Sequence, residues 1–390
     1  MTSSPETSPV PAGPRRTTLS LALLGLAAAA LTGCGSDTGA AGAAGAPVAD
    51  VVEVAATDTS CALSRTDLTA GRTVFKIENT GSQVTEVYVY GQGDAIVTEK
   101  ENIGPGLSYE LTADIPAGDH VVACKPGQTG DGIRTPVTVA AAGAAPVADP
   151  QAEQAVAAYR AYVQEQADEL VPLVEEFAAA VQAGDVTEAK DLYAPSRVPW
   201  EAVEPVAEAF GDLDPEMDLR EADLEPDQEW TGWHRIEKAL WESGTTKGVA
   251  PVADKLVEDV RDLQGRVATA DITAVSIANG AKELLDEVAT GKVTGEEEAF
   301  SHTDLVDFAA NVQGAEKAFE VLRPIVQAND PALVTTLEAA FGEVDAALAQ
   351  YERGDGYVSY DTVGPAERRE LAQVVDALGE PLSQLAAATA

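Results

Sequence analysis

Residues 151–184 read QAEQAVAAYRAYVQEQADELVPLVEEFAAAVQAG, and this stretch decides the fold class of the larger part of the chain. Its apolar residues return every three or four positions, as at Tyr159 and Val163. That period places them on one face of an α-helix. We expect Pro172 to kink or break the helix, because proline lacks a backbone N–H. Gly184 is expected to end it.

The helical pattern continues to the C-terminus. Segments with a helical period cover about 200–210, 230–242, 250–268, 271–290, 303–327, 331–352 and 365–387. Loops rich in Pro and Asp are expected at 194–199 and 211–229. Residues 151–390 are therefore predicted to form an all-α bundle, large enough for a core of its own.

The segment before residue 140 has a different pattern. Short β-branched or alternating runs, separated by turn residues, occupy 51–54, 73–77, 85–90, 108–111 and 120–124. Such spacing predicts a small all-β sandwich over residues 51–140. Stretches rich in Ala, Gly and Pro flank it at 35–50, a flexible tether, and at 141–150, a linker.

The N-terminus has the features of an export signal. Arg15 and Arg16 precede an apolar run over 19–31 that is too short to span a bilayer comfortably. The run ends in Leu31-Thr32-Gly33-Cys34, which resembles a bacterial lipobox. That resemblance implies a signal peptide over 1–34, a lipidated Cys34 and a protein held on the outer face of the cell membrane. The alternative is an ordinary secretory signal with a chance cysteine.

The composition excludes one class of partner. The 390 residues include 65 acidic and 25 basic side chains, which gives a formal net charge of −40. A chain this acidic does not present a phosphate-binding surface, so nucleic acid is not an expected partner. The charge fits either simple solvation or the capture of cations.

The β-segment resembles a cupredoxin, but it lacks a blue-copper ligand set. Such a site needs two His, a Cys and usually a Met, and the residues after Cys124 include neither His nor Met in the expected loop. Export permits a disulfide between Cys61 and Cys124. The alternative is a site for copper or iron built from these cysteines with Glu86, Glu99 and Glu101.

Residues 230–241, WTGWHRIEKALW, contain one of only three histidines in the chain. His234 and Glu237 are three positions apart, so on a helix both point to the same side and can face one ion. A pair of this kind is more often a solvated helical pair than a ligand pair when it occurs alone.

Longer motifs strengthen the case for a metal site. In order along the chain they are LYAPSR at 192–197, EPVAEAF at 204–210, WTGWHRIE at 230–237 and GEEE at 295–298. Together they resemble the EfeO family of bacterial iron-uptake lipoproteins, in which a cupredoxin-like β-domain precedes an imelysin-like helical domain. The resemblance covers about residues 50–390.

This resemblance implies a metal site in the helical domain. His234 and Glu237 match the family's His-x-x-Glu motif and are expected to be ligands, with Asp254 as the third choice and Glu298 as the fourth. The ion is expected to be iron, with copper and zinc as alternatives. The β-domain residues Cys61, Glu86, Glu99, Glu101 and Cys124 also fall at matching places, as a second candidate set. The implied partners are an EfeU-type iron permease and an EfeB-type haem peroxidase.

Catalytic motifs are missing from the sequence. The imelysin-like family carries a peptidase label, but the chain contains neither His-Glu-x-x-His nor Gly-x-Ser-x-Gly. We therefore expect a metal-binding transport component rather than an enzyme. A metallopeptidase and a scaffold lipoprotein are the alternatives.

Overall fold

The computed structural model describes residues 49–142, 149–211, 213–224, 228–354 and 356–389. The expected signal peptide and Cys34 lie outside these residues. Within them, no helix combines the length and apolar character that crossing a membrane requires.

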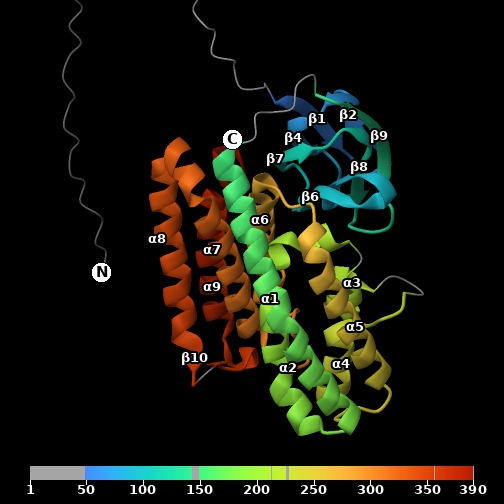
Figure 1. The fold of residues 1–390 in the computed structure, drawn as a ribbon, viewed down its shortest axis with the longest axis vertical. Helices are drawn as coiled ribbons and strands as arrows, with labels where there is room; N and C mark the ends of the chain where they lie inside the picture. The colour runs from blue at the N-terminus through green and yellow to red at the C-terminus, as the bar shows by residue number, and fades with distance from the viewer. Residues whose placement is uncertain (1–48, 143–148, 212, 225–227, 355, 390) are drawn as a thin grey trace, which may run out of the picture. The chain divides into compact units, whose positions relative to one another are not determined.

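The N-terminal domain is a sandwich of two β-sheets (Figure 1), as the sequence predicted. The first sheet has the order β2 (Cys61–Leu63), β1 (Asp50–Ala56), β4 (Gly71–Asn79), β7 (Ser108–Ile115). The second has the order β3 (Asp67–Thr69), β9 (Ile133–Ala140), β8 (Gly118–Pro126), β5 (Thr85–Tyr90), β6 (Ile96–Ile103). Alternate residues of both sheets fill the core between them, including Val52, Phe75, Val87 and Leu111.

A disulfide joins the two sheets. Cys61 of β2 and Cys124 of β8 are bonded, with their Cα atoms 5.5 Å apart. This is the first of the two alternatives left open by the sequence. Because a bonded sulfur has no thiolate to offer, the expectation that Cys61 and Cys124 are metal ligands is corrected.

The C-terminal domain is helical. Its α-helices are α1 (Pro150–Ala183), α2 (Val186–Glu201), α3 (Leu213–Asp218), α4 (Gly232–Trp241), α5 (Ala250–Arg266), α6 (Ala274–Thr290), α7 (Asp304–Asn329), α8 (Pro331–Leu348), α9 (Pro365–Leu382) and α10 (Leu385–Ala388). A 3₁₀ segment, η2 (Glu204–Phe210), follows α2, and another, η5 (Lys292–Thr294), follows α6. Helix α1 packs on α2, α5 and α7. Helix α8 packs against both α7 and α9 and lies at the outer edge of the helices in Figure 1. A small hairpin joins β10 (Glu352–Arg353) to β11 (Gly356–Tyr357).

The predicted loop at 194–199 is wrong, and Pro172 does not break its helix. Pro172 lies inside α1, which runs on to Ala183 and ends at Gly184 in the left-handed conformation. The predicted loop at 194–199 is part of α2. The α2 side chains of Tyr193 and Trp200 are fully buried. Packing of these large side chains outweighs the hydrogen bonds that the prolines remove.

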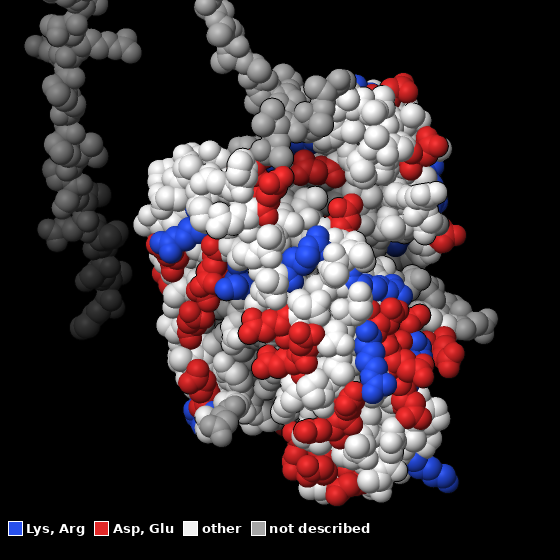
Figure 2. All heavy atoms as spheres, in the orientation of Figure 1, with Lys and Arg blue, Asp and Glu red and all other residues white. Residues whose placement is uncertain are grey.

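The surface reflects the composition. On the face in Figure 2, Asp and Glu side chains cover broad areas of the described residues, with fewer Lys and Arg between them. Acidic side chains also enter the interior of the helical domain, where burying a charge is expensive unless it is paired. The buried acidic side chains of the helical domain are therefore candidates for a functional site.

Candidate metal centre

Helix α4 begins against α3 because residue 232 is a glycine. Gly232 has φ 78°, and a Cβ there would lie 1.9 Å from the Met217 carbonyl oxygen. No other residue allows this close approach. The turn brings His234, on the first turns of α4, next to Asp218 at the end of α3.

His234 is buried, with 2% of its side chain exposed, and both ring nitrogens face carboxylates. Nδ1 lies 3.3 Å from Glu237 Oε2. Nε2 lies 3.2 Å from Asp218 Oδ1 and 3.9 Å from Glu297 Oε1, but it is not aligned for a hydrogen bond. Burial and Arg197 lower the pKa of His234, yet the contacts with Asp218 and Glu237 outweigh them and raise it to about 9.

Glu237 is held in place by the chain that follows η5. Its Oε1 accepts hydrogen bonds from the backbone N–H groups of Phe300, at 2.9 Å, and Ser301, at 2.7 Å. Burial raises the pKa of Glu237, but bonds from His234 and from these N–H groups lower it below its ordinary value. Glu237 is thus ionised, and its remaining oxygen, Oε2, is directed at His234 Nδ1.

Two further carboxylates come from the segment between η5 and α7. Glu298 Oε1 accepts a hydrogen bond from the Tyr193 hydroxyl at 3.1 Å. Burial and the neighbouring Glu237 raise the pKa of Glu298 well above its ordinary value. Glu297 differs from Glu298. Burial raises its pKa, but the nearby cations Lys292 and Arg220 lower it by more, so that it lies below the ordinary value.

Asp218 completes the group from α3. The Trp200 indole N–H donates to its Oδ2 at 2.7 Å, and Arg197 is bonded to it as well. Burial raises the pKa of Asp218, but Arg197 and His234 lower it well below its ordinary value. The pKa values of Asp218 and Glu297 are therefore lowered, which favours their anionic forms, whereas that of Glu298 is raised.

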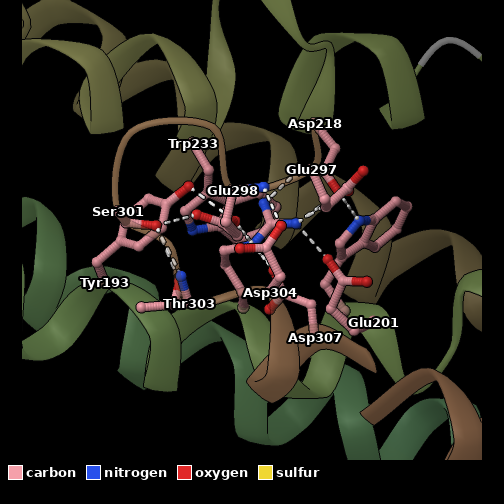
Figure 3. A network of polar contacts seen from close by, with 12 residues as sticks. Tyr193, Glu201, Asp218, Trp233, Glu297, Glu298, Ser301, Thr303, Asp304 and Asp307 are labelled. Carbon is pink, nitrogen blue, oxygen red and sulfur yellow. Dashed lines mark hydrogen bonds and ion pairs between the residues drawn. The ribbon is translucent and has the colours of Figure 1, made fainter. Parts of the chain in front are cut away.

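Among the described residues, two overlapping groups could hold an ion. One is Asp218, His234 and Glu297, and the other is His234, Glu237 and Glu298. In each, one ligand atom per residue lies within 4.8 Å of the others. Two ligands of one ion lie at most about 4.3 Å apart, given metal–ligand distances near 2.1 Å, so small side-chain shifts suffice. In Figure 3, Asp218 at the end of α3 and the adjacent Glu297 and Glu298 of the segment before α7 converge.

More acidic groups surround these ligands than cations do. The neighbouring cations are the buried Arg197 and Lys292 and the partly exposed Arg220, whose Nη1 lies 3.1 Å from Glu297 Oε2. Lys292 Nζ lies 3.0 Å from Glu201 Oε2 and 2.9 Å from Glu204 Oε2. Asp307 is buried and also contacts Arg197. An excess of buried carboxylates with an imidazole suits a divalent or trivalent cation such as Fe, Mn, Zn or Cu.

A sequence model of the imelysin family, described as peptidase M75, matches residues 155–385. The chain belongs to the imelysin family. The match contains every residue of the two ligand groups, so the candidate metal centre lies wholly within the imelysin domain.

Relatives extend the likeness over most of the chain. The protein is 38% identical over 349 residues to proteins named iron uptake system component EfeO from Escherichia coli O1:K1 and from Shigella flexneri. Each alignment covers 86% of this chain and 90% of the relative. The resemblance to the EfeO family is thereby confirmed.

The β-domain has solved counterparts of its own. It is similar to reduced auracyanin from Roseiflexus castenholzii, with 19% identity, a TM-score of 0.21 and coverage of 24% of this chain and 99% of that one. Auracyanin A from Chloroflexus aurantiacus, titled a "blue" copper protein, matches with 16% identity, a TM-score of 0.19 and coverage of 23% and 97%.

The imelysin domain brings some of the expected ligands together and leaves one out. His234, Glu237 and Glu298 meet at one point. Asp254 does not join them: it is exposed on α5, and its Oδ1 accepts a hydrogen bond from Gln182 at 2.6 Å. Its selection as third ligand is corrected, because its position on α5 turns it to solvent rather than to α4.

The β-domain set does not form a site in the structure. Cys124 is opposite Val87 and lies in the core between the sheets, whereas Glu86 is opposite Lys125 on the other face of the same sheet. Glu99 is opposite Tyr88, also on the outer face. Strand alternation thus separates the cysteines from these glutamates, and the five residues, Glu101 included, form no ligand group.

Three residues of the site were not predicted from the sequence: Asp218, Glu297 and Arg197. Glu297 stood in the quoted GEEE motif beside Glu298, and Arg197 in LYAPSR. Both motifs were visible, but three adjacent acidic residues do not tell which one faces inward. Asp218 lay in a segment expected to be a loop, and it carried no signal.

Proposed function

We propose that the protein is a lipid-anchored, extracytoplasmic component of an iron-uptake system that binds iron in its imelysin domain and passes it to a membrane permease. The name of the EfeO relatives, iron uptake system component, supports the iron-uptake assignment. The lipobox-like Leu31-Thr32-Gly33-Cys34 supports the anchor. The implied partners remain an EfeU-type permease and an EfeB-type haem peroxidase.

One observation carries the proposal: His234 Nε2 is buried between two ionised carboxylates without a hydrogen-bond partner. Its 3.2 Å ion pair with Asp218 Oδ1 lacks hydrogen-bond geometry, and a metal ion between Nε2 and the two carboxylates would coordinate all three. We assign the ion to His234 Nε2, Asp218 and Glu297. Its binding would release the Nε2 proton, since a ligating imidazole must be neutral.

Glu237 then has an orienting role. In metal sites the second nitrogen of a ligating histidine commonly donates its N–H to a carboxylate. Glu237 Oε2, 3.3 Å from Nδ1, stands in that position, while its other oxygen is anchored by backbone N–H groups. The alternative places the ion at Nδ1 with Glu237 and Glu298, as the His-x-x-Glu motif implied.

The test is iron binding by the purified protein. Anaerobic Fe²⁺ titration by calorimetry, with Zn²⁺ and Cu²⁺ in parallel, should give saturable binding at one site. His234→Ala should weaken it at least tenfold, which is about 1.4 kcal/mol. His302→Ala is the matched control, because His302 lies outside both ligand groups. Equal iron affinity in His234→Ala and in the unmodified protein would refute the assignment.

The same preparation separates transport from catalysis. A metallopeptidase would hydrolyse peptides with turnover when loaded with Zn²⁺. We expect stoichiometric binding and no cleavage of a mixed peptide library. A scaffold lipoprotein, the third alternative, would bind no ion in either assay.

A further inference from the structure

Arg197 is buried at the centre of the acidic residues that surround the candidate metal centre. It lies on α2, and none of its side chain is exposed. Its guanidinium carbon is 5.5 Å from the centre of the Trp233 ring, within cation–π distance. An arginine enclosed in this way is held by specific partners, since an unpaired buried charge is strongly unfavourable.

All three guanidinium nitrogens contact carboxylates. Nε lies 2.9 Å from Glu298 Oε1 and 3.2 Å from Asp307 Oδ2. Nη1 is bonded to Asp218. Nη2 is bonded to Glu201 and lies 3.6 Å from Glu297 Oε1. Figure 3 shows these five acidic side chains directed toward a common region.

The partners come from segments far apart in the sequence. Glu201 is on α2 itself and Asp218 ends α3, while Glu297 precedes α7 and Asp307 lies on it. Burial lowers the pKa of Arg197, but Asp218, Asp307 and other carboxylates raise it well above the ordinary value, so the guanidinium keeps its charge. Carboxylates brought this close would repel each other without a cation.

Glu297 also accepts a hydrogen bond from Arg220 Nη1 at 3.1 Å. We propose that Arg197, which is bonded to Asp218 and contacts Glu297, is a positioning residue that, together with Arg220 on Glu297, holds these two carboxylates at ligand spacing before the ion arrives. This inference rests on the proposed function, which assigns the ion to these two carboxylates and His234. It names a residue that touches no ion and acts through the ligands.

Two effects of Arg197 on ion affinity oppose each other. Its positive charge repels a metal cation and weakens binding. Its planar fork with five N–H donors fixes several carboxylates at once, which strengthens binding through preorganisation. Lysine separates the two effects, because its ammonium keeps the charge but cannot reach carboxylates on opposite sides of a guanidinium.

The experiment compares Fe²⁺ affinity of the full chain with that of Arg197→Lys and Arg197→Gln. We expect Arg197→Lys to bind at least tenfold more weakly and Arg197→Gln no more tightly than Arg197→Lys. Visible absorption of bound Co²⁺, which reports ligand geometry, should also change in Arg197→Lys. Arg261→Lys is the control, because Arg261 pairs with Glu175 at 2.7 Å on the surface.

The outcomes separate this inference from the function on which it rests. No saturable binding by the unmodified protein would overturn both. Binding by the unmodified protein, with Arg197→Lys unchanged in affinity and Co²⁺ spectrum or with Arg197→Gln tighter, overturns the positioning role alone.

A second variant tests the inference if Arg197→Lys does not fold. If Arg197→Lys loses its helical circular dichroism, Asp307→Asn takes its place, because Asp307 anchors Arg197 Nε yet belongs to neither ligand group. Folded Asp307→Asn should bind Fe²⁺ a few-fold more weakly. Unchanged affinity in that variant overturns the inference.

Discussion

His234 Nε2 lies 3.2 Å from Asp218 Oδ1. The contact joins α4, which was predicted as a helix, to α3, which lies in a segment predicted as a loop. Asp218 ends α3 and His234 lies near the start of α4. The contact exists because Gly232 lets the two helices approach, with no Cβ to meet the Met217 carbonyl. It makes Nε2, rather than Nδ1, the nitrogen to which we assign the ion.

Asp218 and Glu237 should respond differently to amide substitution. Asp218→Asn removes a ligand charge, so Fe²⁺ affinity should fall more than tenfold, about 1.4 kcal/mol or more. Glu237→Gln keeps an oxygen that can accept from Nδ1–H, so affinity should fall less than tenfold. Calorimetric titration of both variants with Fe²⁺ measures which substitution weakens binding more. The reverse order would move the ion to Nδ1, Glu237 and Glu298.

The disulfide should stabilise the β-domain. Cys61 and Cys124 are 63 positions apart, and closing a loop of that length in the unfolded chain contributes up to about 4 kcal/mol. The double variant Cys61→Ser/Cys124→Ser should therefore melt at a lower temperature in calorimetry. Tryptophan fluorescence follows the helical domain separately, because all four tryptophans lie beyond residue 151. Equal melting of both proteins by calorimetry would contradict the prediction.

Raising the pH should lower the free energy of unfolding because of Glu86. Burial and Glu101 raise its pKa from 4.5 to about 7. The folded state therefore holds this proton more tightly than the unfolded state. As pH rises from 4.5 to 7 the unfolded chain ionises first, so stability falls, by about 3 kcal/mol at most, and then levels off.

Urea unfolding between pH 4.5 and 8 checks this effect. The stability difference between Glu86→Gln and the unmodified protein should grow in favour of the variant over that range, because glutamine carries no charge. Glu78→Gln, at an exposed position of β4, should show no such trend. A pH-independent difference for Glu86→Gln would argue against a raised pKa.

Cys34 should carry the lipid. Mass spectrometry of membrane-extracted protein should find a diacylglycerol group on an N-terminal Cys34, because the lipobox-like sequence follows a short apolar run. Cys34→Ala should appear in the soluble fraction. Full membrane retention of that variant would contradict the anchor.

Sequence by itself determined the features that depend on local spacing. The helical period predicted an all-α C-terminal domain, and short alternating runs predicted the β-sandwich, because 3.6- and 2-residue periods are properties of single elements. The same logic placed His234 and Glu237 on one face of α4. Even locally it failed at 194–199, where buried packing keeps two prolines inside α2.

Only the tertiary structure decided what meets across elements. In the folded chain Glu298, Asp218 and Glu297 lie beside His234, whereas Asp254 does not. Cys61 and Cys124 form a disulfide. The tertiary structure also places Arg197 among five carboxylates from different segments. Apart from Arg197 and Glu201, an i,i+4 pair on α2, these contacts join different elements, so residue spacing does not predict them: they follow from how whole helices and sheets pack against each other.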